Sequence, residues 1–353
     1  MSATLVLVRA IHFAAALLLT GVFAFRLFVG DPAFRNADAA GAGADEGAFI
    51  GALTRIAWAA LVLTLLSGAL WLVLQASIMS GRPLPVVLDS NIMPTVMLRT
   101  QAGRDWIVRS GLLLLLGITL TRMSQRLSGS SRGPVVIALA LAAGSAAALV
   151  WAGHGGAATG ARGAVEEAAD AVHLLAAGAW LGGLVPLALL LGAARRAGDE
   201  LWLAVAQNGA TRFSTLGLLS IGSLLATGIV NSFFLVGDLG GLLSTEYGHC
   251  LLLKLCLFVA TVGVAGVNRI RLIPRLFPAS PEVRFEPAWR AIRQLQRNTL
   301  VEASLGLLIL CVVGALGTLP PAAHRHLHLG FQRVVDQTHT SSLRPARNSD
   351  HLS

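Results

Sequence analysis

The residues of this chain best suited to chemistry are histidines. Neutral imidazole is the commonest metal ligand in proteins, and it suits copper, zinc, iron and nickel. An ionisable side chain inside a long apolar run is costly to keep, so it is a functional candidate for that reason. The expected metal ligands are an inner pair, His12 and His173, and a looser outer set, His154, His249, His324 and His326.

Local spacing strengthens two of these positions. Asp170 precedes His173 by three residues, so on a helix the carboxylate shares a face with the imidazole and could orient it or join the site. The segment His324-Arg-His326-Leu-His328 alternates, so in an extended tail the imidazoles would point the same way. Such a tail suits metal capture, and a solvated tail without metal is the competing interpretation.

Methionines provide a second set of candidate ligands. Met79, Met93 and Met97 lie in or beside the segment Ser80–Asp105. Thioether sulfur selects Cu(I), and Met93 and Met97 would share a helical face. Ordinary apolar packing explains so small a group equally well.

These residues belong to a chain built to cross a membrane. Of its 353 residues, 55% are hydrophobic and 13% are charged, which is too little charge to cover a water-facing surface. We therefore predict an all-α polytopic membrane protein with about eight transmembrane helices. The expected spans are Thr4–Val29, Gly51–Ile78, Trp106–Arg122, Pro134–Trp151, Ala169–Ala194, Phe213–Val236, His249–Val267 and Thr299–Leu319.

The net charge of +9 comes mainly from arginines between the apolar runs. There they set orientation, so nucleic acid is not an expected partner. Arginine-rich segments at 122–132, 195–212 and 269–297 predict three cytoplasmic loops, which would leave both termini periplasmic. The segment Ser80–Asp105 does not follow this pattern, because it should face outward and yet holds three arginines.

The two halves of the chain resemble each other. Thr100-x-x-Gly103 and Thr245-x-x-Gly248 are each followed by a basic residue six positions on, and His12 and His173 each precede a glycine by nine. We predict two parallel four-helix halves, 1–152 and 153–320, and a polar tail, 321–353. A pseudo-two-fold axis along the membrane normal would relate His12 to His173. Two unrelated packing histidines are the alternative.

Several other residues have a predicted role. Gly178 and Gly182 form Gly-x-x-x-Gly, which indicates close helix packing. Trp180 is interpreted as a packing residue. Lys254 is expected to extend toward the outer headgroups, and Glu302 to pair with an arginine such as Arg269. The sequence has no Walker motif or dinucleotide fingerprint, so neither ATP-driven transport nor an enzyme is expected.

At these motifs the chain resembles the membrane domain of the copper resistance protein D (CopD) family. The resemblance implies an eight-span bacterial inner-membrane protein that handles periplasmic copper ions, usually described as moving them toward the cytoplasm. It also implies a separate periplasmic copper-binding partner of the CopC type. The residues that carry it are Asp170-Ala-Val-His173, Trp180-Leu-Gly182-Gly183, Ala226-Thr-Gly228-Ile-Val-Asn231, Thr245-Glu-Tyr-Gly248 with Lys254, and Asn268-Arg269 with Glu302.

Three functions stay open on these grounds. In the first, copper is captured by the outer histidines, passed to a site between the halves at His12 and His173, and released inward. In the second, the protein is a b-type haem electron-transfer or copper-reducing protein, with two histidines from different helices as axial ligands. In the third, it senses copper or assists assembly without moving the ion.

Overall fold

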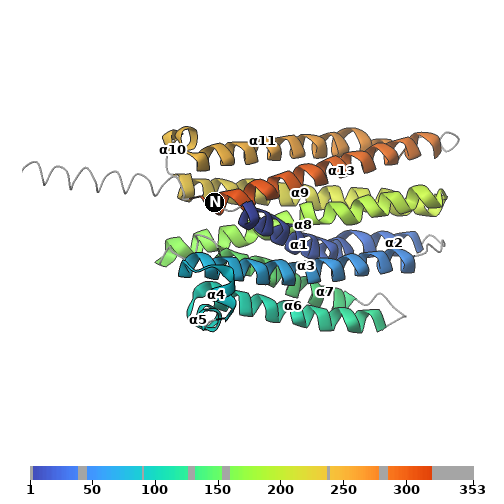
Figure 1. Cartoon of the computed structure of the whole chain (residues 1–353). Helices are drawn as coiled ribbons and strands as arrows, with labels where there is room; N and C mark the ends of the chain where they lie inside the picture. The colour runs from blue at the N-terminus through green and yellow to red at the C-terminus, as the bar shows by residue number, and fades with distance from the viewer. Residues whose placement is uncertain are drawn as a thin grey trace, which may run out of the picture.

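The chain folds into a bundle of long helices that run roughly parallel to one another (Figure 1). The computed structural model describes residues 3–38, 46–89, 91–125, 132–152, 160–236, 239–277 and 285–319. Eight helices in these ranges are long and apolar enough to span a membrane, and the same ranges contain no strand. The prediction of an all-α polytopic membrane protein is therefore confirmed.

The first half contributes four spans. Its two short helices, α4 and α5, lie at one end of the bundle (Figure 1). The elements are α1 (Ala3–Phe25), continued by a π-helical turn (Arg26–Gly30) and α2 (Asp31–Asp38); α3 (Glu46–Ser80); α4 (Leu84–Asp89); α5 (Ile92–Arg99); α6 (Gln101–Gln125); and α7 (Arg132–Ala147), ended by a 3-10 turn (Ala148–Ala152).

The second half contributes the other four spans. Its elements are α8 (Gly160–Ala197); α9 (Glu200–Val236); α10 (Leu239–Ser244); α11 (Glu246–Val267), continued by a π-helical turn (Asn268–Leu272) and α12 (Ile273–Arg275); and α13 (Phe285–Leu316).

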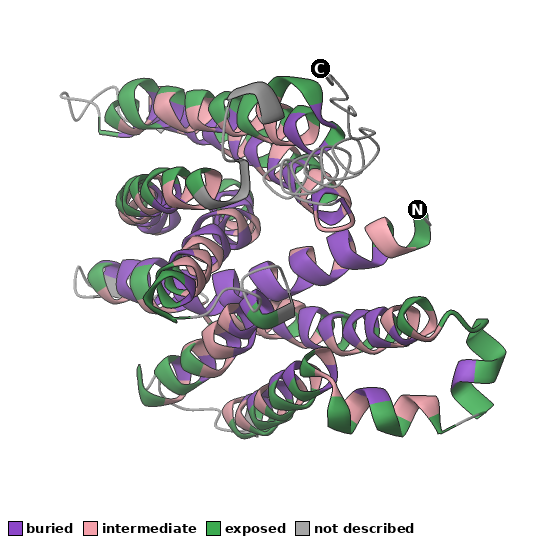
Figure 2. Cartoon of the chain, turned by 90° about the vertical axis from the view of Figure 1, so that its left-hand side faces the viewer, coloured by how far each residue is buried: buried purple, intermediate pink, exposed green. Residues whose placement is uncertain are grey.

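The helices α1 and α8 form the centre of the bundle. Their most apolar stretches are 67% and 61% buried, whereas that of α11 is 6% buried and faces outward. Figure 2 shows the same contrast, since buried residues predominate along α1 after its exposed start, while exposed residues cover the outer helices. Gly21 on α1 meets Gly182 on α8, and a Cβ at either glycine would overlap the backbone of the opposite helix. The close packing predicted from Gly178 and Gly182 is thus present.

Helix ends differ from the prediction. The α6 helix begins at Gln101 rather than Trp106, and α9 begins at Glu200 rather than Phe213. The segment Ser80–Asp105 was expected to be a loop, but it contains α4, α5 and the first turn of α6. The apolar window marks only the part of a helix that lies in hydrocarbon, while polar residues extend the same backbone hydrogen bonding beyond it.

Candidate metal-binding site

His173 is held so that one ring nitrogen is available to a ligand. Its Nδ1 lies 2.9 Å from Oγ1 of Thr227 on α9. The Thr227 hydroxyl donates its own proton to the carbonyl oxygen of Ser223 at 2.7 Å, so Oγ1 must accept from Nδ1–H. We therefore infer the tautomer in which Nε2 carries the lone pair, which is the form that binds a metal.

A cavity of about 570 Å³ lies against His173, between α1 and the second-half helices α8, α9, α11 and α13. Its wall is mostly apolar. Asp170 on this wall accepts a hydrogen bond from Nδ2 of Asn231 at 2.6 Å, and Oδ1 of Asn231 is buried without a hydrogen-bond partner. An orphaned buried acceptor beside a carboxylate and an imidazole is a feature that a bound cation would satisfy.

Of the two roles considered for Asp170, orienting the His173 ring is absent, and the expectation for Lys254 was wrong. The hydrogen-bond partner of the His173 ring is Thr227, whereas Asp170 is bonded to Asn231. Lys254, expected to reach the headgroups, lines the cavity together with Asp170 and His173. A carboxylate and an ammonium in one membrane cavity offset part of each other's desolvation cost, which explains why Lys254 stays inside.

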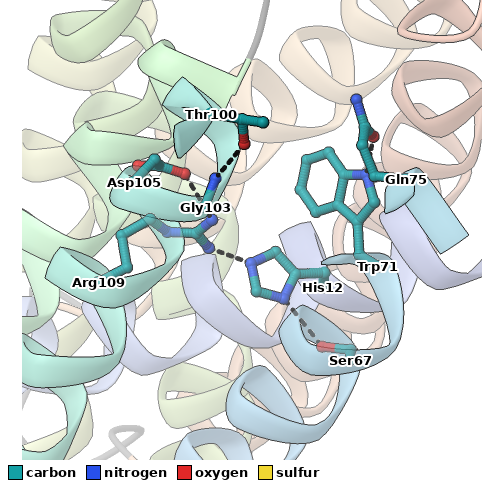
Figure 3. A network of polar contacts seen from close by, with 8 residues as sticks. All are labelled: His12, Ser67, Trp71, Gln75, Thr100, Gly103, Asp105 and Arg109. Atoms are coloured by element: carbon teal, nitrogen blue, oxygen red, sulfur yellow. Dashed lines mark hydrogen bonds and ion pairs between the residues drawn. The ribbon is translucent and has the colours of Figure 1, made fainter. Parts of the chain in front are cut away.

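His12 has a different environment in the first half (Figure 3). Its Nδ1 lies 2.9 Å from Oγ of Ser67, whose own proton goes to the carbonyl of Leu63 at 2.6 Å. Its Nε2 contacts the guanidinium of Arg109, and the ring packs edge-on to Trp71 with centroids 5.5 Å apart. Both nitrogens are occupied, and a guanidinium stands where a cation would have to bind. In this arrangement neither ring nitrogen of His12 is open to a metal ion.

The structure does not bring His12 and His173 together. Each ring bonds within its own half, to Ser67 on α3 or to Thr227 on α9. Phe13, the neighbour of His12, lines the His173 cavity instead. The described residues therefore form no single intramembrane site shared by the two histidines, because each ring is held by a hydroxyl of its own half.

The contacts of the two halves nevertheless correspond. The bond of His12 to Ser67 matches that of His173 to Thr227. The hydroxyls of Thr100 and Thr245 accept from the amides of Gly103 and Gly248, at 3.1 and 2.9 Å. These matches are what a parallel repeat requires, and the repeat itself stays a prediction. The two halves differ in charge at the position three residues before the histidine. This position holds the cation Arg9 before His12 and the anion Asp170 before His173.

The other candidate ligands lie elsewhere. His249 is exposed near the start of α11, where its Nε2 lies 2.8 Å from the carbonyl oxygen of Leu243. Met93 and Met97 pack on a small apolar cluster around Val87 and Val96, whereas Met79 is 55% exposed at the end of α3. In the described ranges no three His, Cys, Asp or Glu side chains converge as a ready metal cage. His154, His324 and His326 lie outside the described residues.

Sequence reasoning missed the residues that orient the two imidazoles. Ser67 and Thr227 lie 55 and 54 residues after their histidines, and this matched spacing was a usable signal. The predicted partner of Glu302 was wrong as well. Its Oε1 accepts from Nδ2 of Asn268 at 2.5 Å, while Arg269 donates to Ser214 at 2.7 Å.

The buried ion pair beside His12 predicts a large effect on stability. Arg109 lies 3.4 Å from Asp105 with both side chains at most 5% exposed, whereas Arg290 and Glu286 are 3.9 Å apart with at least 69% exposure. We expect Arg109→Leu to strand a buried carboxylate and cost about 3–5 kcal/mol, seen as a lower melting temperature in detergent. Arg290→Leu removes an exposed pair at the same spacing and should cost no more than about 0.5 kcal/mol. Equal melting temperatures for the two variants would contradict this account.

Two family descriptions match the chain: "Copper resistance protein D-like, N-terminal domain" over residues 1–164 and "Copper resistance protein D" over residues 209–316. Copper resistance protein D of Pseudomonas syringae pv. tomato is 30% identical over 265 residues, which cover 73% of this chain and 80% of that protein. Inner membrane protein YebZ of Escherichia coli K12 is 29% identical over 267 residues, covering 74% and 83%.

Copper transport protein CutJ of Bacillus subtilis strain 168 is 29% identical over 177 residues, or 49% of this chain and 31% of that longer protein. No solved structure gives a significant match. The N-terminal description covers the helices around His12, and the other covers Thr227, Lys254 and Glu302 in the second half. On these matches, the chain belongs to the copper resistance protein D family.

Proposed function

We propose that this protein carries copper across the bacterial inner membrane, from the periplasm to the cytoplasm, and that His173 is the ligand that receives the ion inside the membrane. Copper is the substrate here and not a resident cofactor. The observation that carries the proposal is the His173 ring, whose Nδ1 is held by Thr227 and whose Nε2 is left for a ligand at the wall of a large cavity. An intramembrane imidazole kept open in this way marks a substrate pathway more often than a packing position.

The neighbours of His173 indicate which form of copper would bind. Asp170 and the orphaned Oδ1 of Asn231 add oxygen ligands beside the imidazole nitrogen. A mixed nitrogen and oxygen set suits Cu(II) better than Cu(I), which prefers sulfur. No methionine of the described residues lines this cavity, so none of them adds sulfur to the site. We therefore expect Cu(II) to be the ion that enters the cavity.

The names of relatives support the copper assignment. A family member is named copper resistance protein D, another relative is named copper transport protein CutJ, and a third is named inner membrane protein YebZ. The arginine-rich segments between spans support cytoplasmic loops at those positions. With that orientation both termini lie in the periplasm, and the His173 cavity lies in the periplasmic half of the membrane. A periplasmic copper-binding protein of the CopC type would then deliver the ion, with His154, His249 and the tail histidines as an outer capture set.

Uptake into vesicles tests the proposal. Purified protein in sealed vesicles should accumulate copper, measured by metal analysis of washed vesicles, at a rate well above protein-free vesicles. Zinc and nickel in the same assay report selectivity. If copper binds the protein but does not enter the vesicles, transport is contradicted and a role in copper sensing or assembly is favoured.

The cavity also favours a second candidate function. A volume of about 570 Å³ with a mostly apolar wall and one open imidazole exceeds what a copper ion needs. Such a space suits a large planar cofactor such as haem, with His173 as the single axial histidine. Ligation by both inner histidines is not supported, since Arg109 occupies the Nε2 side of His12. A Soret band in the purified protein that is lost in His173→Ala would favour this function, and a colourless protein would exclude it.

A further inference from the structure

A second cavity lies beyond Trp180 in the same half of the protein. It has a volume of about 160 Å³. It is lined by the first part of α13, from Leu295 to Glu302, whereas the His173 cavity is lined by the last part, from Ile309 to Leu316. Trp180 lines both cavities, is 1% exposed and packs edge-on to Phe258 at 6.2 Å. The two cavities are therefore stacked along the helices with one tryptophan between them.

The second cavity holds a buried carboxylate that copper ligation does not use. Glu302 is 3% exposed and receives a hydrogen bond from Asn268. Three ion pairs join described residues, and none of them includes Glu302. No cationic side chain of the described residues therefore lies within 4.0 Å of its carboxylate. An uncompensated carboxylate in a membrane is expensive, and taking up a proton removes most of that cost.

A path of polar side chains leads from Glu302 toward the start of α13. Asn268 accepts from Nδ2 of Asn298 at 2.7 Å, and Asn298 accepts from Nε2 of exposed Gln294 at 2.8 Å. Residues 294, 298 and 302 follow one another at four-residue intervals, so they form a stripe about 12 Å long on one face of the helix. The cavity lined by Glu302 and Asn268 has room for several waters, each needing at least about 10–15 Å³. Water in it could carry protons between the carboxylate and the surface.

The charged surroundings of Glu302 are sparse. Arg269 is the one other charged residue that lines the cavity in the described chain, and it donates to Ser214 on α9. On α8, Arg195 donates to Gln296 at 2.6 Å, and Gln296 does not line the cavity. Arg9 on α1 meets Gly317, at the opposite end of α13. The nearby arginines, Arg269 and Arg195, thus donate to Ser214 and Gln296 rather than to Glu302. This leaves a proton as the partner of the Glu302 carboxylate.

We propose that Glu302 binds and releases the protons that accompany copper movement. The step is the reversible addition of one proton to the Glu302 carboxylate, exchanged with water at the Gln294 end of α13, and it needs no further reactant. The proposal rests on copper transport by the same helices, and it places proton exchange in a cavity separate from the copper ligands.

Glu302→Gln tests the proposal against a matched control on the same helix. Glu286→Gln makes the same change at an exposed position near the start of α13. A pH-sensitive dye inside copper-transporting vesicles should report a pH change on copper addition for the parent and for Glu286→Gln. For Glu302→Gln this signal should fall about a hundredfold, as expected when a positioned proton-transfer group is lost, while copper binding to purified protein stays at the parent level. Glu302→Asp should restore part of the signal.

Infrared spectroscopy gives a measurement that does not depend on copper. A carbonyl band of a protonated carboxyl group should be present in the parent and absent in Glu302→Gln. A folded Glu302→Gln protein that keeps both the pH change and the band would overturn the proposal, as would a parent that moves copper with no pH change. A parent that moves no copper would instead overturn the proposed function, and the infrared band would then decide whether Glu302 takes up a proton.

Discussion

His173→Ala is expected to abolish copper uptake into vesicles. Loss of a residue that merely supports a metal ligand lowers metal affinity about 10–100-fold, so loss of the ligand itself should cost at least about 100-fold. The protein should still fold, because the imidazole faces a cavity and makes one side-chain hydrogen bond, to Thr227. The rate of copper uptake and the copper content of the purified variant are the two measurements.

Three further variants separate ligation from structure. Thr227→Val removes the acceptor that orients Nδ1 and should weaken copper binding about 10–100-fold. His249→Ala removes one histidine of the outer capture set and leaves the others, so uptake should stay at half the parent rate or better. His12→Ala should keep copper binding but lower the melting temperature, since it leaves a gap beside Trp71 and removes one contact each from Arg109 and Ser67. Copper binding that is lost in His12→Ala and kept in His173→Ala would reverse the assignment.

Gly182→Val is expected to prevent assembly of the bundle. A Cβ at position 182 would overlap the carbonyl oxygen of Leu17 on α1 and lie 2.7 Å from its carbonyl carbon. Both atoms belong to backbone, so no side-chain rotation can relieve the overlap, and α1 and α8 would have to separate. The cost should exceed the about 1–3 kcal/mol of ordinary overpacking.

Gly222→Val is the matched control, because a Cβ there has no atom of another element within 4 Å. Detergent extracts of cells that produce each variant should contain a monodisperse protein for Gly222→Val and little or none for Gly182→Val. Gly182→Ala should fall between the two. Normal assembly of Gly182→Val would mean that the α1 and α8 contact is not the centre of this fold.

The general fold could be predicted from the sequence because hydrophobicity and length directly reflect the membrane. Eight apolar runs gave eight spans, and Gly178 and Gly182 marked the close approach of α8 to α1. The ends of α6 and α9 could not be predicted in this way, because a helix continues into polar sequence without a change in backbone geometry. The two short helices between Ser80 and Gln101 were missed for a related reason, since neither is long enough to show a period.

The sequence predicted which histidines lie in the membrane, but not which of them has a ring nitrogen open to a ligand. His12 and His173 look alike in sequence, and both bond a hydroxyl through Nδ1. What separates them is the residue that approaches Nε2, and Arg109 lies 97 positions from His12 along the chain. Side chains from distant helices meet according to helix rotation, which a single sequence does not specify. Lys254 and Glu302 were assigned the wrong surroundings for the same reason.

The position of copper in the loaded protein tests the central claim most directly. Anomalous scattering at the copper edge, from crystals of copper-treated protein, locates the ion without assuming a ligand. We predict a peak within coordination distance of Nε2 of His173, with Asp170 or Asn231 on its other side, and no such peak in Thr227→Val crystals treated at the same limiting copper concentration. A peak at His12, or copper bound only by residues outside the membrane spans, would contradict the account.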